Sequence, residues 1–588
     1  MQDTIPRVLE AAADAWGPRP AMKFRRDDKW ESISWEEYCR DVRLAARGLM
    51  ALGLEVGRGV VIIGYNRPEW FIANQAAMAA GGIPAGIYTT STPQQCAYIA
   101  THSEAQIAIV ENTEQLEKFR AERENFPEFH AIVLMEGTDP DENVITFDEL
   151  ISRSSEVSPE TLDARLAELK PEALATLIYT SGTTGPPKAV MLSHRNLVWT
   201  AAISAEALEV GPDDQLISYL PLSHIAEQIA THHISLRSGA CVAFAESLEK
   251  LGENLRDIQP TVFLGVPRVW EKIQAGIQMA GAEVSGLKKK ITGWAKGVGL
   301  AGGYSDQKGH SKPALYGLAD KLVFSKVRDR LGFNRIRYCI TSAAPISLDT
   351  LEFFLSLGIP IMEVYGLSEC TGPATVSLPD RYRTGSVGVA APETEVVVAD
   401  DGELLIRGPH VFMGYYKDER ATRATLDDRG WLHTGDIGTI DELGFIRITD
   451  RKKDILITAG GKNVAPQNLE GHLKSIPVVA QAVIIGDRKP YLSALLTLDE
   501  SRVPQVAHKI GSNATNAIEA ASCTVFNAYL RAEIDKIDAK LSRAETIKKF
   551  VILPADFSIE GGELTPTMKI KRNVVRDRYA KEIETLYG

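Results

Sequence analysis

The stretch Thr180–Lys188, which reads TSGTTGPPK, has the residue types of an anion-binding loop. Gly182 and Gly185 allow the backbone to approach an anion closely, while hydroxyl side chains and a lysine supply donors and a positive charge. An apolar, β-branched run over 174–179 precedes the loop and a helix-like segment begins near His194, so the expected order is strand, loop, lysine, helix. The stretch therefore predicts a phosphate-binding loop. Its hydroxyl donors are Thr180, Ser181, Thr183 and Thr184, and its lysine is Lys188.

The same loop departs from the P-loop of kinases and ATPases. A Walker motif places Gly, Lys and then Ser or Thr in succession. Here Pro186 and Pro187 separate Gly185 from Lys188, and Ala189 takes the hydroxyl position. A purely structural turn would use some of the same residue types, but a run of this length and content favours phosphate binding. The departure argues against kinases and P-loop ATPases.

Residues 179–194, YTSGTTGPPKAVMLSH, resemble the signature of the adenylate-forming (AMP-binding) superfamily, which includes acyl-CoA synthetases, peptide-synthetase adenylation domains and beetle luciferases. Further motifs of that superfamily follow in the family's order, so the resemblance extends from about residue 20 to residue 575. Two motifs depart from the pattern: one reads SAAP where the family usually has GGAP, and the last reads TMK where the family has SGK. The motifs cover residues 220–224, 340–347, 362–369, 402–416, 430–438, 450–470 and 564–572.

The resemblance implies an ATP site. Tyr365 inherits the role of packing on the adenine, and Asp436 and Arg451 inherit contacts with the ribose hydroxyls. Glu369, together with Thr180, inherits the coordination of Mg²⁺, which suits a carboxylate placed beside a triphosphate. The residues assigned to ATP are Thr180, Ser181, Gly182, Thr183, Thr184, Gly185, Lys188, Glu363, Tyr365, Gly366, Ser368, Asp436, Arg451 and Lys569.

The resemblance also assigns catalytic groups. In the family, a histidine at the position of His224 sits at the carboxylate end of the acyl pocket. A lysine of the last motif reaches the α-phosphate and the carboxylate oxygens during adenylation. We assign Lys569 to this role and keep Lys571 as the rival, because Met568 stands where the family has glycine. The predicted catalytic residues are Lys569, His224, Glu369 and Lys188.

Members of this superfamily rotate their C-terminal domain between two half-reactions. Lys453, two residues after Arg451, matches the hinge position. Gly460 and Gly461 lie on the segment that approaches the pantetheine arm of coenzyme A, where the absence of side chains lets the backbone pass close. The resemblance therefore implies ATP, Mg²⁺ and coenzyme A as the small-molecule requirements.

The substrate class depends on longer stretches of resemblance. Residues 430–453 and 318–332 resemble long-chain fatty acyl-CoA synthetases, and PLSHIAEQ over 221–228 resembles their bubblegum-type branch. We therefore expect an enzyme, an ATP-dependent, AMP-forming long-chain fatty acid:CoA ligase that acts through acyl-AMP. A fatty acyl-AMP ligase that delivers to a carrier protein is the alternative. A non-catalytic nucleotide-binding homologue is disfavoured, because Lys188, Glu369 and the final lysine are all present.

Composition limits the other classes of function. The 588 residues include 65 Lys and Arg against 77 Asp and Glu, a formal net charge of −12, which argues against a nucleic-acid partner. The six cysteines lie far apart without a CxxC pair, which predicts a reduced, cytoplasmic protein. The N-terminal stretch lacks the features of a signal peptide, and no run approaches the ~18 apolar residues of a membrane span. We expect any membrane contact to be peripheral, and the oligomeric state stays open.

The elements that position these residues follow an α/β pattern. From about residue 60, short β-branched runs alternate with helical stretches, which predicts a large N-terminal body, 1–450, of parallel-sheet αβ layers. Closely spaced strand candidates over 385–450 predict a β-rich subdomain of that body. The charged tetrad 450–453 then precedes a new alternation, so we place the boundary here and expect a small, mobile α+β domain over 451–588.

One segment outside the motifs has a marked pattern. Apolar residues from Ile273 to Val298 step by three and four, which predicts a single long helix with an apolar stripe. Lysines flank it near Lys288, so we expect it either to pack on the body or to contact anionic lipid. The glycine-rich stretch 297–310 predicts a surface loop after the helix.

Overall fold

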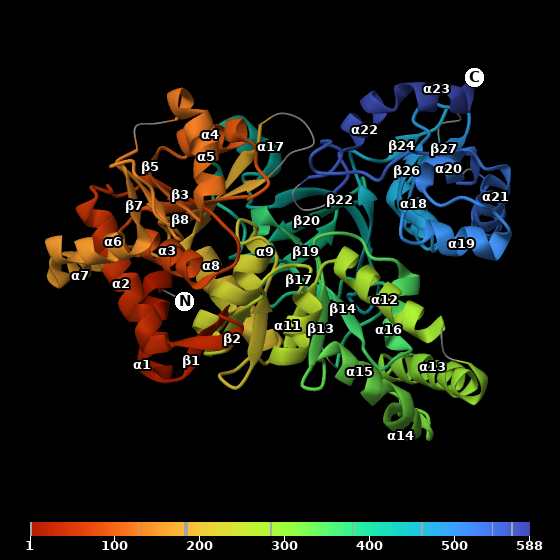
Figure 1. The fold of residues 1–588 in the computed structure, drawn as a ribbon, viewed down its shortest axis with the longest axis horizontal. Helices are drawn as coiled ribbons and strands as arrows, with labels where there is room; N and C mark the ends of the chain where they lie inside the picture. Colours follow the sequence, from red (N-terminus) through yellow and green to blue (C-terminus); the bar gives the residue numbers. More distant parts are fainter. Residues whose placement is uncertain are drawn as a thin grey trace. The chain divides into compact units, whose positions relative to one another are not determined.

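The computed structural model describes residues 3–126, 129–180, 186–282, 285–378, 380–459, 462–543, 545–565 and 569–588. The chain forms two compact units (Figure 1). The first consists of Met1–Ala343, Phe354–Val396 and Leu405–His433, and the second of Ala344–Phe353, Val397–Leu404 and Thr434–Gly588. The boundary after residue 450 that the sequence predicts stays a prediction.

The first unit contains an eight-stranded sheet in the order β21-β9-β8-β4-β3-β5-β6-β7. The strands from β8 to β7 are parallel, while β9 and β21 are antiparallel to their neighbours. These strands are β3 (Gly59–Ile63), β4 (Ile83–Ile87), β5 (Ala105–Val110), β6 (Ala131–Leu134), β7 (Val144–Thr146), β8 (Leu174–Thr180), β9 (Lys188–Ser193) and β21 (Gly414–Tyr415).

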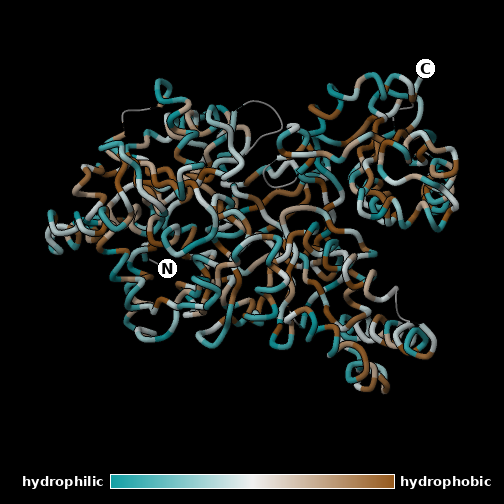
Figure 2. The backbone as a smooth tube through the Cα atoms, in the orientation of Figure 1, coloured by the Kyte–Doolittle hydropathy of each residue, from teal (hydrophilic) through white to brown (hydrophobic). Residues whose placement is uncertain are grey.

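Both faces of this sheet are buried. Val60 and Ile62 of β3 belong to one hydrophobic core and Val61 and Ile63 to another, as the alternation of side chains along a strand requires. The apolar runs that mark the strands stand out along the backbone in Figure 2. Helices cover both faces, as expected for parallel strands. One face packs against α4 (Pro93–His102) and α5 (Thr113–Ala121), and the other against α2 (Trp35–Ala51), α3 (Pro68–Ala79) and α8 (His194–Ala207).

The first unit also contains two smaller sheets. Parallel strands form a three-stranded sheet in the order β12-β13-β14, and a four-stranded sheet has the order β10-β11-β1-β2. These strands are β1 (Pro20–Arg26), β2 (Lys29–Ser34), β10 (Gln215–Ser218), β11 (Cys241–Phe244), β12 (Val262–Gly265), β13 (Tyr338–Thr341) and β14 (Ile361–Glu363).

The segment after the predicted phosphate loop differs from the expected order. Helix α8 begins at His194, as expected, and Ser193 caps it by accepting a hydrogen bond from the backbone N–H of Asn196. Between Lys188 and this helix, however, the chain forms strand β9 rather than continuing directly into the helix. The apolar run 189–192 pairs with β8 on one side and β21 on the other, so tertiary pairing determines its conformation.

The predicted single long helix is two helices. The structure has α12 (Pro267–Ala282) and α13 (Gly286–Asp306), and residues 283–284 between them lie outside the described residues. Gly286 has a φ of +61°, a left-handed conformation that ends regular α-helix geometry. The stripe from Ile273 to Val298 is therefore divided between two elements.

The expected loop over 297–310 is wrong for most of its length, because α13 continues to Asp306. The glycines of this stretch allow close packing in place of a flexible loop. A Cβ atom on Gly299 would lie 2.1 Å from the carbonyl oxygen of Ser356, and one on Gly303 would lie 2.3 Å from Cδ1 of Leu355. Packing thus offsets the low helix propensity of glycine, roughly 1 kcal/mol per residue.

The second unit contains a three-stranded sheet in the order β26-β27-β28. One face packs under α18 and α21, and the other under the C-terminal helices. The stretch expected to be β-rich forms a separate four-stranded sheet, β19-β20-β22-β23. These elements are β19 (Glu395–Val398), β20 (Glu403–Arg407), β22 (Leu432–Ile440), β23 (Ile446–Arg451), α18 (Pro466–Lys474), β26 (Val479–Ile485), β27 (Leu492–Leu498), α21 (Thr524–Asp538), β28 (Ile547–Ile552), α22 (Arg572–Arg578) and α23 (Ala580–Tyr587).

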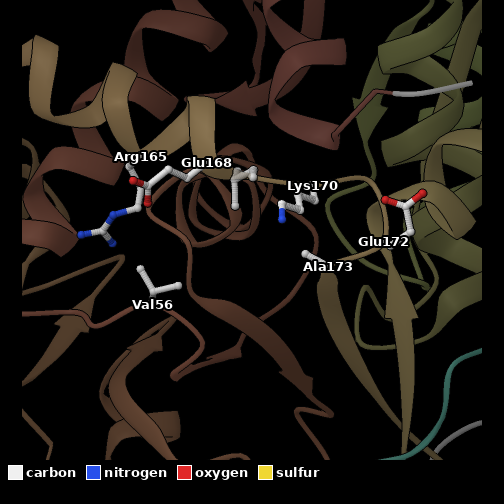
Figure 3. A pocket seen from close by; sticks show the side chains of 7 residues that line it. Val56, Arg165, Glu168, Lys170, Glu172 and Ala173 are labelled. Carbon is white, nitrogen blue, oxygen red and sulfur yellow. The ribbon is translucent and has the colours of Figure 1, made fainter.

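A surface pocket of about 400 Å³ lies at the start of β8 (Figure 3). Lys170, Glu172 and Ala173 line it together with Val56 and Arg165. Seven residues of β8, at ~3.3 Å each, separate this end from the predicted phosphate loop by roughly 20 Å. The pocket is therefore remote from the predicted ATP site. Within the described ranges, no helix is both long and apolar enough to cross a bilayer.

Candidate active site

Strands β8 and β9 form a hairpin that closes the predicted phosphate loop. Thr180 and Lys188 are paired across the two antiparallel strands, and Oγ1 of Thr180 donates to the carbonyl oxygen of Lys188 at 3.4 Å. The two ends of the loop are thus fixed at the carboxyl end of β8, where ligands bind in parallel α/β sheets. The remaining predicted donors and glycines, Ser181, Gly182, Thr183, Thr184 and Gly185, lie outside the described residues.

A lysine, a tyrosine and a glutamate form a chain of contacts beside this hairpin. Nζ of Lys188 lies 4.6 Å from the centre of the Tyr415 ring, and the Tyr415 hydroxyl donates to Oε1 of Glu369 at 2.7 Å. The chain depends on sheet register, because Tyr415 of β21 is paired with Val190 of β9. Two of the predicted catalytic residues, Lys188 and Glu369, are thereby linked through a residue that the sequence analysis did not assign.

Tyr415 keeps its proton in this environment. Burial, together with the charge of the Glu369 carboxylate, raises the pKa of Tyr415. The phenol therefore acts as a neutral donor that orients Glu369 without cancelling its charge. A carboxylate has a second oxygen and further lone pairs, so an oriented Glu369 can also face a cation.

These groups fit a nucleotide-bound Mg²⁺. Across the described part of the chain, no set of three or more His, Cys, Asp and Glu side chains gathers to hold a metal alone. Mg²⁺ in nucleotide enzymes is typically bound by one or two carboxylates plus substrate phosphates and water. The carboxylate of Glu369 and the hydroxyl of Thr180 are oxygen ligands of that kind.

The predicted adenine motif forms a compact turn after β14. A Cβ atom on Gly366 would lie 1.7 Å from the carbonyl oxygen of Gly372, so only glycine fits there. The backbone N–H of Tyr365 donates to Oγ1 of Thr375 at 3.0 Å, and the Tyr365 side chain is half-buried. Ser368 is buried one position before Glu369. The motif is thus held in one conformation by its own backbone contacts.

Glu363, assigned to ATP, already has a partner within the protein. Its Oε2 accepts a hydrogen bond from the backbone N–H of Gly385 at 2.7 Å, and its carbonyl oxygen accepts one from Ser377 Oγ at 2.9 Å. Both contacts join β14 to the chain that follows the adenine motif. The structure thus gives Glu363 a role in fixing the motif.

His224 caps the short helix α9 (Ile225–Glu227). Its Nδ1 accepts a hydrogen bond from the backbone N–H of Ala226 at 3.1 Å. Nδ1 is therefore unprotonated, and neutral His224 carries its proton on Nε2, where it can serve as a donor. Helix α9 contacts β16 (Gly372–Pro373), which pairs with β15 (Gly366–Leu367). The His224 turn therefore lies beside the adenine motif.

A buried carboxylate stabilises the chain around His224. Glu227 is 1% exposed, and its Oε1 accepts hydrogen bonds from Ser218 Oγ at 2.7 Å and Thr231 Oγ1 at 2.9 Å. Asn66 donates to both Ser218 Oγ and the Leu220 carbonyl oxygen. Burial raises the pKa of Glu227 to about 7. The sequence analysis gave Glu227 no role, although it lies within the PLSHIAEQ stretch.

In the second unit, Asp436 and Arg451 form an ion pair. They are paired across strands β22 and β23, and Nε of Arg451 lies 3.0 Å from Oδ1 of Asp436. Asp436 is only 4% exposed, whereas half of the Arg451 side chain is exposed. The sheet register thus brings together the two residues predicted to contact ribose.

Acidic residues surround the predicted hinge. Asp450 is buried, and burial raises its pKa to about 6. Nζ of Lys452 lies 2.6 Å from Asp401 and 2.9 Å from Glu403, which ties the turn to β20. Lys453 is exposed in the turn between β23 and β24 (Leu456–Ile457). The predicted coenzyme A contacts, Gly460 and Gly461, lie outside the described residues.

The two candidate lysines of the last motif have different surroundings. Thr565 and Lys569 are joined by two hydrogen bonds, from Lys569 N to Thr565 Oγ1 at 3.0 Å and from Thr565 N to the Lys569 carbonyl oxygen at 2.8 Å. These bonds bring Lys569 to the base of the turn, where it is exposed. Lys571 instead precedes helix α22, and its N–H donates to the carbonyl oxygen of Glu563. Their positions favour Lys569 as the more accessible of the two.

Comparison with known proteins establishes the family of this chain. A family of AMP-binding enzymes matches residues 9–416, and the corresponding C-terminal domain matches residues 453–588. The chain belongs to the AMP-binding enzymes. Long-chain-fatty-acid–CoA ligase ACSBG2 of Xenopus laevis is 41% identical to it, over 99% of this chain and 84% of the relative. Human long-chain-fatty-acid–CoA ligase ACSBG1 is 39% identical, over 99% and 85% respectively.

Solved structures confirm the predicted fold class. The adenylation domain of a carboxylic acid reductase from Segniliparus rugosus, in complex with AMP and a co-purified carboxylic acid, matches with a TM-score of 0.76 at 21% identity. The match covers 99% of this chain and 94% of that domain. The mixed α/β architecture, with a large N-terminal body and a smaller C-terminal part, is thus that of an AMP-binding enzyme.

Tyr415 is the residue of this AMP-binding enzyme that sequence reasoning most clearly missed. It lies 46 positions from Glu369, and the two are brought together by the pairing of β21 with β9 and by the backbone hydrogen bond from Phe412 N–H to the Glu369 carbonyl oxygen. The sequence offered one signal, since Tyr415 falls at the end of the motif over 402–416.

Proposed function

We propose that this chain is an AMP-forming long-chain fatty acid:CoA ligase. The observation that carries the proposal is the match over 99% of the chain to a long-chain-fatty-acid–CoA ligase at 41% identity. The arrangement of Lys188, Tyr415 and Glu369 supports it, because it combines a cation and an oriented carboxylate at the end of a phosphate-binding hairpin. Its substrates are a long-chain fatty acid, ATP and coenzyme A.

In the first half-reaction, a carboxylate oxygen of the fatty acid attacks the α-phosphorus of ATP. A bond forms between this oxygen and phosphorus, the bond from phosphorus to the β-phosphate oxygen breaks, and pyrophosphate leaves. Lys188 and Lys569 stabilise the negative charge that grows on the phosphate oxygens. His224 donates from Nε2 to the fatty acid carboxylate and holds it in line, since its Nδ1 is occupied by Ala226.

Mg²⁺ is held in this proposal by Glu369 and Thr180. When bound, it supplies positive charge that offsets the charge of the phosphates. Tyr415 contributes by donating a hydrogen bond that keeps the Glu369 carboxylate oriented. Around the nucleotide, Tyr365 packs on adenine, with Glu363, Gly366 and Ser368 fixing its motif.

Asp436 and Arg451 are proposed to bind the ribose hydroxyls. A carboxylate accepts hydrogen bonds from two adjacent hydroxyls, which suits the 2′ and 3′ positions of ribose. The ion pair with Arg451 holds Asp436 in one orientation before the nucleotide arrives. This preorganisation lowers the cost of ordering the side chain on binding.

In the second half-reaction, the sulfur of coenzyme A attacks the carbonyl carbon of acyl-AMP. A carbon–sulfur bond forms, the bond from the carbonyl carbon to the phosphate oxygen breaks, and AMP leaves. Lys453 is proposed as the hinge residue between the two half-reactions, and Gly460 and Gly461 as the backbone that borders the pantetheine arm. We further propose a cytoplasmic enzyme whose contact with membranes is peripheral.

An isotope-exchange experiment tests the adenylation step alone. Labelled pyrophosphate is incubated with the protein, ATP and Mg²⁺, with and without a long-chain fatty acid and without coenzyme A. The proposal predicts that label enters ATP only when the fatty acid is present. Acid-dependent formation of ADP, or no exchange with any fatty acid, would contradict it.

A further inference from the structure

The helical segment formed by α14 (Tyr316–Ala319) and η4 (Asp320–Phe324) has two apolar faces. Ala319 and Phe324 belong to a small core that also contains Ala295 of α13. A second set of apolar side chains, spaced by three and four residues, points to solvent. These are Leu315, Leu318 and Leu322, with 52%, 48% and 39% of their surface exposed. The first face anchors the segment to this small core, whereas the second is left exposed to solvent.

The stretch of sequence that contains this leucine face is strongly basic. Residues 286–332 contain eight Lys and two Arg against three Asp and no Glu, a net charge of +7, so the rest of the chain carries −19. Two of the acids pair locally, Asp320 with Arg328 at 2.8 Å and Asp306 with Lys312 at 3.8 Å. Lys321, which adjoins Leu322, is exposed and has no carboxylate partner among the residues that the structure describes. The same holds for Lys326.

The start of α13 repeats this combination of residues. Leu287 is 73% exposed and is followed directly by three exposed lysines, 288–290. Helices α13, α14 and α15 (Ser325–Leu331) are drawn in green in Figure 1. In Figure 2, hydrophobic positions recur along them beside hydrophilic ones. Exposed leucines beside lysines thus occur at two places in one basic region of the first unit.

We propose that the leucine face of Leu315, Leu318 and Leu322 binds the surface of an anionic lipid bilayer. The leucines enter the interface between headgroups and acyl chains, and Lys321 and Lys326 pair with lipid phosphates and carboxylates. Long lysine side chains suit this arrangement, because their stems lie along apolar surface while their ammonium groups stay in water. The basic charge of the region on an acidic protein favours an anionic membrane as the partner.

The proposal predicts a dependence on both lipid charge and leucine. A lysine near an anionic bilayer contributes about 1 kcal/mol, or about a fivefold change in partitioning. Three half-exposed leucines that enter the interface contribute roughly tenfold or more together. Binding should therefore be strong on anionic vesicles, weak on neutral ones, and reduced by salt.

Co-sedimentation of the full-length protein with vesicles tests the proposal. Vesicles of pure phosphatidylcholine are compared with vesicles that also contain phosphatidylserine, without fatty acid, ATP or coenzyme A. The triple variant Leu315→Gln, Leu318→Gln, Leu322→Gln is expected to lose binding at least about tenfold. The pair Lys321→Gln, Lys326→Gln is expected to lose it on anionic vesicles by about fivefold for each lysine. Thermal unfolding of each variant establishes that it is folded.

Matched controls come from exposed residues elsewhere. Leu248→Gln and Leu443→Gln, which are 52% and 61% exposed in the protein, should leave binding unchanged, as should Lys540→Gln and Lys581→Gln. Equal binding of the triple variant and the wild type would overturn the proposal. So would self-association of the chain that the triple variant abolishes, which would assign the face to a second copy. The inference deepens the peripheral membrane contact proposed above, and it does not depend on the proposed ligase activity, because vesicle binding is measured without the substrates of that activity.

Discussion

The two carboxylates assigned to the nucleotide are held in different ways in the two units. In the first unit, Glu369 accepts a hydrogen bond from the neutral phenol of Tyr415 at 2.7 Å. In the second, Asp436 is almost fully buried and pairs with the guanidinium of Arg451 at 3.0 Å. A neutral donor orients a carboxylate and leaves its negative charge in place. A positively charged partner orients the carboxylate and also offsets its negative charge. Glu369 is thus suited to a cation, and Asp436 to neutral hydroxyls.

The largest expected effect concerns Lys569, a residue of the second unit that is proposed to act in only one half-reaction. Lys569→Ala should lower acyl-AMP formation by about 10³-fold, because it removes a positive charge from the developing phosphate charge. Thioester formation from supplied acyl-AMP should be nearly unchanged. Both steps are measured separately by product analysis, with Lys571→Ala as the matched control. An equal loss in both steps, or a larger loss in the control, would contradict the assignment.

The next largest effect tests the cation role of Glu369. Glu369→Gln keeps the size of the side chain and its acceptor for Tyr415 but removes the negative charge. We expect about a 10²-fold loss in acid-dependent pyrophosphate exchange, partly recovered by higher Mg²⁺ concentrations. Exchange rates are measured across a Mg²⁺ titration. An unchanged Mg²⁺ dependence would remove Glu369 from the metal site.

Asp436→Asn tests the other carboxylate of the comparison, the one assigned to ribose. The variant loses the ion pair with Arg451 and one acceptor for ribose, so the KM for ATP should rise by about tenfold. The Mg²⁺ dependence should not change, because the Asp436 carboxylate is proposed to bind ribose and not the metal. Steady-state kinetics with ATP and Mg²⁺ varied independently decides this. A Mg²⁺ dependence altered as strongly as in Glu369→Gln would remove the distinction between the two carboxylates.

Tyr415→Phe should have a smaller effect than loss of Glu369 itself. The substitution keeps the ring over which Lys188 lies and removes only the donor to Glu369. We expect about a fivefold loss in adenylation rate, since one hydrogen bond to a charged group contributes roughly 1.5–3 kcal/mol and water can replace part of it. Pyrophosphate exchange measures it, with Tyr416→Phe as the neighbouring control. A loss as large as that of Glu369→Gln would indicate a more direct role for the phenol.

Glu227 extends the comparison to a buried carboxylate that accepts hydrogen bonds from two hydroxyls, those of Ser218 and Thr231. Burial raises its pKa from 4.5 to about 7, so between these values the folded protein binds a proton that the unfolded chain has released. The free energy of unfolding should therefore fall as pH rises from about 4.5 to 7, by at most about 3 kcal/mol. Glu227→Gln should remove this fall. Urea unfolding at pH 5 and pH 8 checks the prediction, and identical pH dependence in both proteins would contradict it.

Local pattern was enough to predict much of the molecule. The β-branched runs at 60–63, 107–110 and 174–179 form strands of the main sheet, because buried parallel strands need continuous apolar residues. The order of the motifs predicted the AMP-binding family, and the comparison with known proteins confirms it. The loop predicted from the low helix propensity of glycine was wrong at α13. There the glycines are helical, and they pack so closely against Ser356 and Leu355 that larger residues would collide with them.

The contacts within the candidate site could not be predicted from any single segment of the sequence, because they depend on how distant segments pair. The bond between Tyr415 and Glu369 follows from the register of β21 on β9, and the pairing of Asp436 with Arg451 follows from the register of β22 on β23. The proton position of His224 likewise depends on a backbone N–H two residues away. Motifs identified which residues to consider, while sheet register determined how they are held.

Quantification of products across fatty acids of increasing chain length tests the central claim most directly. The protein is incubated with ATP, Mg²⁺ and each acid, with and without coenzyme A, and AMP, pyrophosphate, acyl-AMP and acyl-CoA are measured together. We predict equal amounts of AMP, pyrophosphate and acyl-CoA when both coenzyme A and a long-chain acid are present, and pyrophosphate with acyl-AMP but no acyl-CoA when coenzyme A is left out. Acyl-AMP without thioester in the presence of coenzyme A would instead indicate a carrier protein as the acceptor, and no pyrophosphate with any acid would contradict an enzymatic role.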